Sequence, residues 1–250
     1  MKKIVFAILS CFFISVGFAQ DTLPPVPSTP VKNTARKINL QKQAGDHFML
    51  QISSDHWAGM PDSISSHQQG FSRGFNAYFM FNKPFKGSPH LSLGIGVGVS
   101  TSNMIFKRMD IGIYSLTPTL PFTPLDSANH YKKYKLATTY LQVPLEFRYT
   151  AKPDEPNKSF KAAIGLKIGT LVNAHTKGKT LVDKGNQTLN TYTEKENSKR
   201  FINGTQFMGT ARVGYGIFSL FGSYQLNNVL KDGTGPNMKL FQVGLTISGL

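Results

Sequence analysis

The chain has 250 residues, with 28 Lys and Arg against 13 Asp and Glu, a formal net charge of +15 and one cysteine. It is too long for a disulfide-stapled miniprotein and, with 19 Phe and 9 Tyr, too aromatic for a disordered tail. Its charged fraction of 16% is low for a soluble domain, which argues against a typical cytosolic enzyme.

The N-terminal segment 1–19 has the layout of a secretory signal peptide. Lys2 and Lys3 precede an apolar run over residues 4–18, and small residues at its end suit cleavage. The run is shorter than the ~20 residues of a membrane-spanning helix. The only cysteine, Cys11, falls inside it, so we expect the processed chain to hold no thiol and no disulfide.

Two further segments follow. Residues 20–45 contain four prolines and scattered basic residues without apolar periodicity, which predicts an extended periplasmic tail. Residues 46–250 show no convincing helical period and no second apolar run near 20 residues, so inner-membrane helices are not expected.

The third segment instead alternates with a period of two. In 91–100 every odd position is a large aliphatic residue and every even position is Gly or Ser. The same alternation is clear in 140–149 and 241–248. Weaker copies occupy 47–54, 71–81, 160–172, 206–214 and 217–227. These are candidate strands near the ~9–11 residues that a tilted strand needs to cross a bilayer.

The composition of the two strand faces selects between all-β architectures. A soluble barrel needs a charged, hydrated outer face, whereas here the non-apolar face is mostly Gly, Ser, Thr, Ala and Gln. The apolar face must therefore meet lipid, where every backbone group needs a partner and the sheet must close. The predicted fold is an all-β, eight-stranded antiparallel transmembrane β-barrel, a meander, in the bacterial outer membrane.

Connection lengths agree with this topology. Long or turn-rich segments, 55–70, 101–138, 173–205 and 228–237, alternate with short ones, 82–89, 151–158 and 214–216. If the tail is periplasmic, the long loops lie outside the cell. Aromatic residues near strand ends are expected to form interface girdles: Trp57, Phe71, Phe81, Tyr140, Tyr149, Phe160, Tyr215, Phe218 and Tyr224.

A family resemblance rests on residues 140–147, Tyr-Leu-Gln-Val-Pro-Leu-Glu-Phe. This segment resembles the Tyr-x-x-hydrophobic-Pro-Leu strand of the Bacteroidetes outer-membrane β-barrel family that includes the secretion protein PorT. The similarity extends loosely over 46–250, through 91–100, Ser-Tyr-Gln-Leu at 223–226 and Val-Gly-Leu at 243–245. The resemblance implies the barrel architecture, but the functions of the family's members are diverse.

The inward face of the predicted strands carries four charged residues, Glu146, Arg148, Lys167 and Arg212. Buried charges are costly unless paired, so a salt-bridged plug is the first interpretation. A narrow anion-preferring path is the alternative. Pro144 cannot donate to a strand ladder, so we expect a bulge or a locally opened pair there.

No catalytic, cofactor or metal site is predicted. The six histidines are spread singly, and the glycines of 94–98 lack the spacing and following helix of a nucleotide loop. Ser53, Ser54, Asp55 and His56 contain the ingredients of a surface lipid hydrolase, but adjacency in sequence is not triad geometry.

The two longest loops carry a basic excess. If they lie outside, they face phosphate-rich lipid headgroups, lipopolysaccharide included; solvated, silent loops are the alternative. Nucleic acid is not an expected partner of a surface protein. The basic loop residues are Lys107, Arg108, Lys132, Lys133, Lys135, Lys177, Lys179, Lys199 and Arg200.

Three functions follow from these patterns. The first is a non-enzymatic outer-membrane barrel that interacts with the envelope or cell surface through its basic loops. The second, by analogy with PorT, is an accessory component of an envelope protein-secretion system. The third is a narrow pore.

Overall fold

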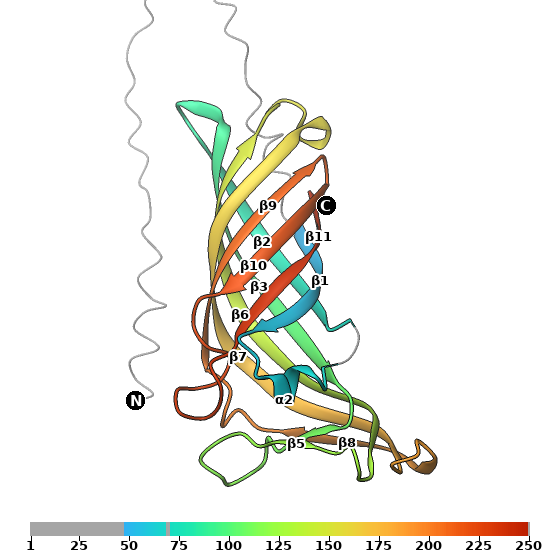
Figure 1. Ribbon diagram of the computed structural model, residues 1–250. Coiled ribbons are helices and arrows are strands. Elements are labelled where there is room, and N and C mark those ends of the chain that lie inside the picture. The colour runs from blue at the N-terminus through green and yellow to red at the C-terminus, as the bar shows by residue number, and fades with distance from the viewer. Residues whose placement is uncertain (1–47, 69–70, 250) are drawn as a thin grey trace, which may run out of the picture. The chain divides into compact units, whose positions relative to one another are not determined.

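The computed structural model describes residues 48–68 and 71–249, which are almost entirely strands and their connections (Figure 1). The predicted signal peptide, 1–19, and the Pro-rich tail, 20–45, lie outside the described residues. Among the described residues, no helix combines the length and the apolar content needed to cross a bilayer.

The wall is one antiparallel sheet closed on itself. Its neighbours run in the order β6, β3, β2, β1, β11, β10, β9, β7, and β6 also pairs with β7, which completes the ring. Consecutive wall strands therefore pair with each other, and the first strand, β1, pairs with the last, β11. This confirms the predicted eight-stranded meander. The wall strands are β1 (Phe48–Ala58), β2 (Arg73–Phe85), β3 (Ser88–Phe106), β6 (His130–Thr150), β7 (Phe160–Val182), β9 (Thr205–Tyr215), β10 (Phe218–Gln225) and β11 (Lys239–Ser248).

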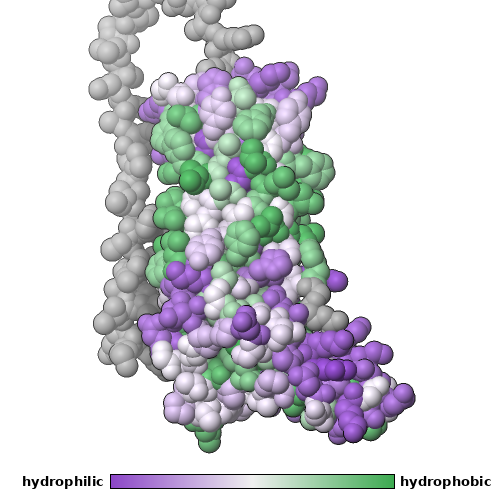
Figure 2. Space-filling view, viewed as in Figure 1, coloured by the Kyte–Doolittle hydropathy of each residue, from purple (hydrophilic) through white to green (hydrophobic). Residues whose placement is uncertain are grey.

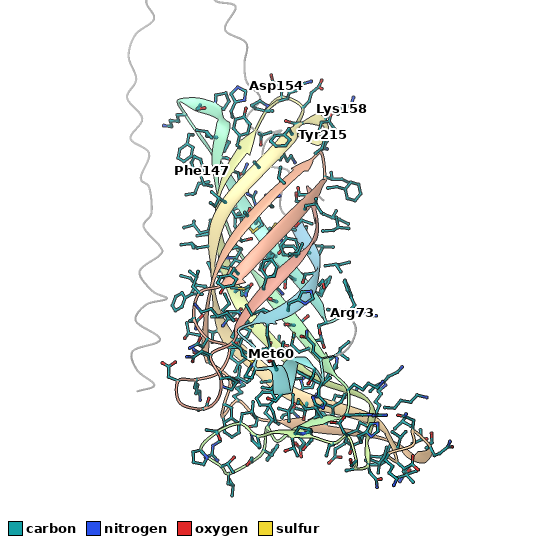
Figure 3. The ribbon with its side chains drawn as sticks, in the orientation of Figure 1. Met60, Arg73, Phe147, Asp154, Lys158 and Tyr215 are labelled. Atoms are coloured by element: carbon teal, nitrogen blue, oxygen red, sulfur yellow. The ribbon has the colours of Figure 1, made fainter. Side chains whose placement is uncertain are left out.

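The two ends of the barrel differ in their connections. At the short-turn end, β2–β3 and β9–β10 are joined by two-residue turns, and β6–β7 by a connection with the 3-10 helix η3 (Pro156–Lys158). Asp154, Lys158 and Tyr215 mark this end in Figure 3. The loop end carries α2 (Asp62–Ser65), the small sheet of β4 (Met109–Ile111) and β5 (Phe122–Pro124), and β8 (Thr188–Asn197).

Side chains alternate between the two faces of the wall as the sequence pattern predicts. Val97, Leu145 and Ile164 point outward and are 46%, 44% and 66% exposed, whereas the neighbouring Glu146 is 1% exposed. Figure 2 shows apolar surface over the barrel wall, and Phe147 projects from it in Figure 3. Since strand walls expose such a belt only to hydrocarbon, this is a lipid-facing surface.

Several predicted loops are in fact strands that continue beyond the apolar belt. The strand predicted at 140–149 starts at His130, and the one predicted at 160–172 ends at Val182, where β8 pairs with it. We call these extensions, residues 130–138, 173–182 and 188–197, the arm. Beyond the belt the outward positions meet water and carry polar residues such as Lys133 and Lys177, so the apolar alternation that reveals a membrane strand is lost although the ladder continues.

The loop end is packed with apolar side chains. Trp57, expected in an interface girdle, is instead 6% exposed and packs 5.8 Å from the ring of Phe106. Met104, Leu136, Phe201 and other loop-end residues complete one buried cluster with them. The loops therefore fold back over the barrel mouth, and the apolar side chains that they contribute are buried there.

Candidate functional site

The barrel interior holds an ion-pair network around one carboxylate. Glu146 and Arg148 alternate on β6 with outward apolar residues, so both point inward. The Nε of Arg148 lies 2.9 Å and the NH2 of Arg212 lies 3.1 Å from the same oxygen, Oε2 of Glu146. Arg212 also donates to Ser248 Oγ at 3.3 Å. Gly94 leaves room for the Arg148 side chain, because a Cβ at this position would lie 2.6 Å from Arg148 Nε.

Lys167 lies in the same interior but among neutral groups. Its Nζ donates to Gln51 Oε1 at 3.0 Å and to Ser223 Oγ at 3.5 Å. The ammonium also lies 5.1 Å from the ring centroid of Tyr78 and 5.4 Å from that of Phe221, within cation–π range. The structure thus places the four predicted charged residues inside the barrel. Arg148 and Arg212 pair directly with Glu146, whereas Lys167 does not.

A chain of amides crosses the interior beside these charges. Gln142 accepts from the Tyr78 hydroxyl at 2.5 Å and donates to Gln206 Oε1 at 2.6 Å. Gln206 in turn donates to Gln225 Oε1 at 3.1 Å. None of these three glutamines was predicted to be a site residue. Their positions in the alternating pattern of the predicted strands nevertheless place all three on the inward face. They cross-link opposite walls and fill the interior.

Asp55, which was not predicted to face the interior, is a second buried carboxylate. Asp55 accepts from Ser53 Oγ at 2.5 Å and from Gln242 Nε2 at 3.0 Å, all inside the barrel. His56, the next residue, points outward, where its Nε2 lies 2.9 Å from Ser54 Oγ. The strand alternation therefore places the Asp on the opposite face of the wall from the Ser–His pair. The three groups form no hydrolase triad.

Pro144 sits in a continuous part of β6. The β3–β6 register is the same on both sides of it, but the pairs 96–144 and 97–143 are missing from the ladder. The bulge of this strand lies elsewhere, between Thr139 and Tyr140 against β7. Since proline has no N–H to donate, the ladder opens at Pro144 without a change of register.

The outer face of the arm and the adjoining wall form a basic cavity of about 830 Å³. Lys177 and Lys179 come from β7, Lys133 and Lys135 from β6, and Arg73 from the start of β2. Lys135 Nζ donates to Asn103 Oδ1 at 2.6 Å. The remaining lining residues are Lys132, Asn103, Ile105, Phe106 and Tyr134.

Burial and neighbouring cations lower the pKa of two groups here. The pKa of Lys135 is lowered, first by burial and then by Lys177, Lys179 and Lys195. The pKa of His175 is likewise lowered by burial, then by Lys195, Lys135 and Lys177. Burial is the larger cause of both shifts, and the neighbouring lysines add to it.

The other predicted basic residues lie outside the cavity. Arg200 donates to the backbone carbonyls of Ser115 and Leu116 at 3.4 and 3.2 Å, and so fastens one loop to another. Arg108 has a positive φ of 51°. The cavity lining does not include Lys107 or Lys199.

The inner face of the arm is acidic. Asp110, Glu194 and Glu196 line a second cavity of about 390 Å³ with Tyr131 and Tyr134. Tyr134 donates to Asp110 Oδ1 at 2.9 Å, and Tyr131 donates to Glu194 Oε2. Burial, then Asp110 and Glu194, raises the pKa of Glu196. The arm therefore separates opposite charges onto its two faces.

Within residues 48–68 and 71–249 no group of three or more His, Cys, Asp or Glu side chains is arranged to hold a metal ion.

Comparison with known proteins points to an outer-membrane barrel. The family described as outer membrane protein beta-barrel domain matches residues 18–231. Among solved structures, the chain is similar to Ail, the attachment invasion locus protein of Yersinia pestis, with 12% identity and a TM-score of 0.31 over 80% of this chain and 94% of that one. Comparison with the curated proteins gives no match.

Proposed function

Because the chain belongs to the family of outer membrane protein beta-barrel domains, we propose that it is a non-enzymatic surface protein that acts through its loop end rather than its interior. The observation that carries the proposal is the combination of a filled lumen with a structured arm. The arm's wall strands run to 21 and 23 residues, far more than a bilayer crossing needs.

The filled interior argues against the narrow pore. Glu146, Arg212 and the glutamine chain occupy the lumen, and the apolar cluster around Trp57 covers its mouth. A barrel of eight strands encloses little more than its own side chains. In planar bilayers we therefore expect a closed record at all voltages, and stepwise conductance would favour the pore instead.

Charge at the loop end supports contact with anionic envelope components. Long loops of outer-membrane barrels face outward, which would bring the basic loop residues to the phosphate-rich surface of lipopolysaccharide. Opposite charges attract across such a surface within about one Debye length, ~10 Å at 0.1 M salt.

Titration with lipopolysaccharide in an uncharged detergent tests this proposal. One variant carries Gln at the basic loop residues, and a control carries Lys83→Gln, Lys86→Gln, Lys152→Gln and Lys158→Gln at the short-turn end. We expect only the loop variant to lose binding, and the wild-type affinity to fall with salt. Equal affinity of both variants and the wild type would contradict the proposal.

A role like that of PorT gives a different result in cells. Deleting 20–45 while leaving the loops intact should not reduce protein secretion if the loop end is the working surface. Loss of secreted cargo after this deletion, with residues 112–121 dispensable, would favour an accessory role in secretion.

A further inference from the structure

The basic cavity has a feature that general surface charge does not explain. Across β6 and β7, Lys133 lies directly opposite Lys179 and Lys135 opposite Lys177; across β7 and β8, Lys177 lies opposite Lys195. Like charges directly opposite in a sheet destabilise it. Three such pairs side by side indicate a surface shaped to receive an anion.

Carboxylates are kept away from these lysines by the strand alternation. Glu194 and Glu196 flank Lys195 in the sequence, yet both line the cavity on the inner face of the arm. The outer face is thus left with an uncompensated row of ammonium groups. Lysine ammonium groups bind phosphate as compact point charges.

The cavity adjoins the lipid-facing belt. Arg73 comes two residues before Phe75, which is 47% exposed on the belt, and Ile105 adds an apolar wall. Figure 1 shows β8 leaning outward from the barrel, and Figure 3 places Arg73 on the wall above it. Figure 2 shows the strongly hydrophilic surface of the same region. The outer face of a leaning arm looks back toward the membrane surface.

We propose that the cavity between Arg73 and the lysines of the arm binds the phosphorylated headgroup of a lipid in the leaflet around the loop end. This inference rests on the proposed function, and it names the site and the ligand class. The volume of about 830 Å³ is far more than one phosphate fills. The row of cations therefore suits a headgroup with two or more phosphates, with Asn103 as a neutral donor and acceptor beside them.

The test compares two variants of equal charge. The cavity variant carries Lys135→Gln, Lys177→Gln and Lys179→Gln. The control carries Lys158→Gln, Lys184→Gln and Lys231→Gln, which are all exposed and lie outside both the cavity and the set of basic loop residues. The full chain is assembled in phosphatidylcholine nanodiscs in which about one lipid in fifteen is a diphosphorylated glycolipid. Native mass spectrometry then counts the glycolipid molecules bound to each protein. The shift between boiled and unboiled gel samples verifies folding of each variant.

We expect about tenfold or greater loss of glycolipid binding in the cavity variant and less than about twofold loss in the control. Equal losses would overturn the site and leave general electrostatic contact, the proposed function, standing. No loss in either variant would overturn both. Inorganic phosphate and pyrophosphate distinguish the source: either one binding as tightly as the glycolipid would overturn the assignment to a lipid headgroup.

Discussion

Glu146→Gln should be among the most destabilising single changes in the barrel. The carboxylate is 1% exposed and its Oε2 accepts from both Arg148 and Arg212. Hydrogen bonds to charged groups contribute ~1.5–3 kcal/mol each, and removing one partner of a buried ion pair costs ~3–5 kcal/mol because the other charge is left uncompensated. Glutamine keeps the shape and one carbonyl acceptor, so we expect a loss of about 3–5 kcal/mol in the free energy of unfolding.

Reversible unfolding by urea in phospholipid vesicles, followed by the boiled-versus-unboiled gel shift, measures this loss. Glu155→Gln, exposed at the short-turn end, is the matched control and should change stability by less than ~0.5 kcal/mol. In the Glu146→Gln background, Arg212→Gln should cost less than in the wild type, because the arginine has already lost its partner. A Glu146→Gln barrel within ~1 kcal/mol of wild type would refute the reasoning that the carboxylate holds the interior together.

Three further predictions concern the wall, the loop end and the arm. Val97→Arg, on the lipid-facing belt, should cost ~2–4 kcal/mol in the same unfolding assay, whereas Val97→Leu should be nearly neutral; equal stabilities would contradict the face assignment. Phe106→Ala should cost ~3–5 kcal/mol and shift Trp57 fluorescence to the red as water enters the cluster; unchanged emission would place Trp57 elsewhere. NMR titration of His175 should give a pKa below the ordinary value of 6.5, since burial and three neighbouring lysines disfavour its charged form. A lowered folded-state pKa means that His175 destabilises the fold as the pH drops below the unfolded-state pKa. Bound diphosphorylated lipid should raise it, and a pKa that does not move would count against the headgroup site.

The wall could be predicted from sequence because its two faces meet opposite environments. The alternation in 91–100 identifies the inward and outward positions of β3. The same period-two alternation in their own strands places Glu146 and Arg212 on the inward face. The alternation does not identify the partners: Arg148 and Arg212 share one oxygen of Glu146 because only β7 separates β6 from β9 in the wall.

The loop end could not be predicted in the same way. Beyond the belt, the outward positions of 130–138 and 173–182 are mostly polar, so no lipid-facing apolar stripe marks these strands, although the inward Tyr134 and Leu136 are buried. The burial of Trp57 depends on loops far apart in the sequence folding over one mouth. The basic cavity likewise needs the β6–β7 register to set lysine opposite lysine, which no local pattern reveals.

The seam between β1 and β11 sets the order of assembly. Met49 pairs with Ser248 and Ala58 with Lys239, so ring closure joins residues about 180 to 200 positions apart in the chain. Until β11 is available, β1 presents an open edge of unpaired peptide groups, which hydrocarbon does not tolerate. The peptide groups of β1 are therefore satisfied in the membrane only when the last strand of the wall pairs with the first.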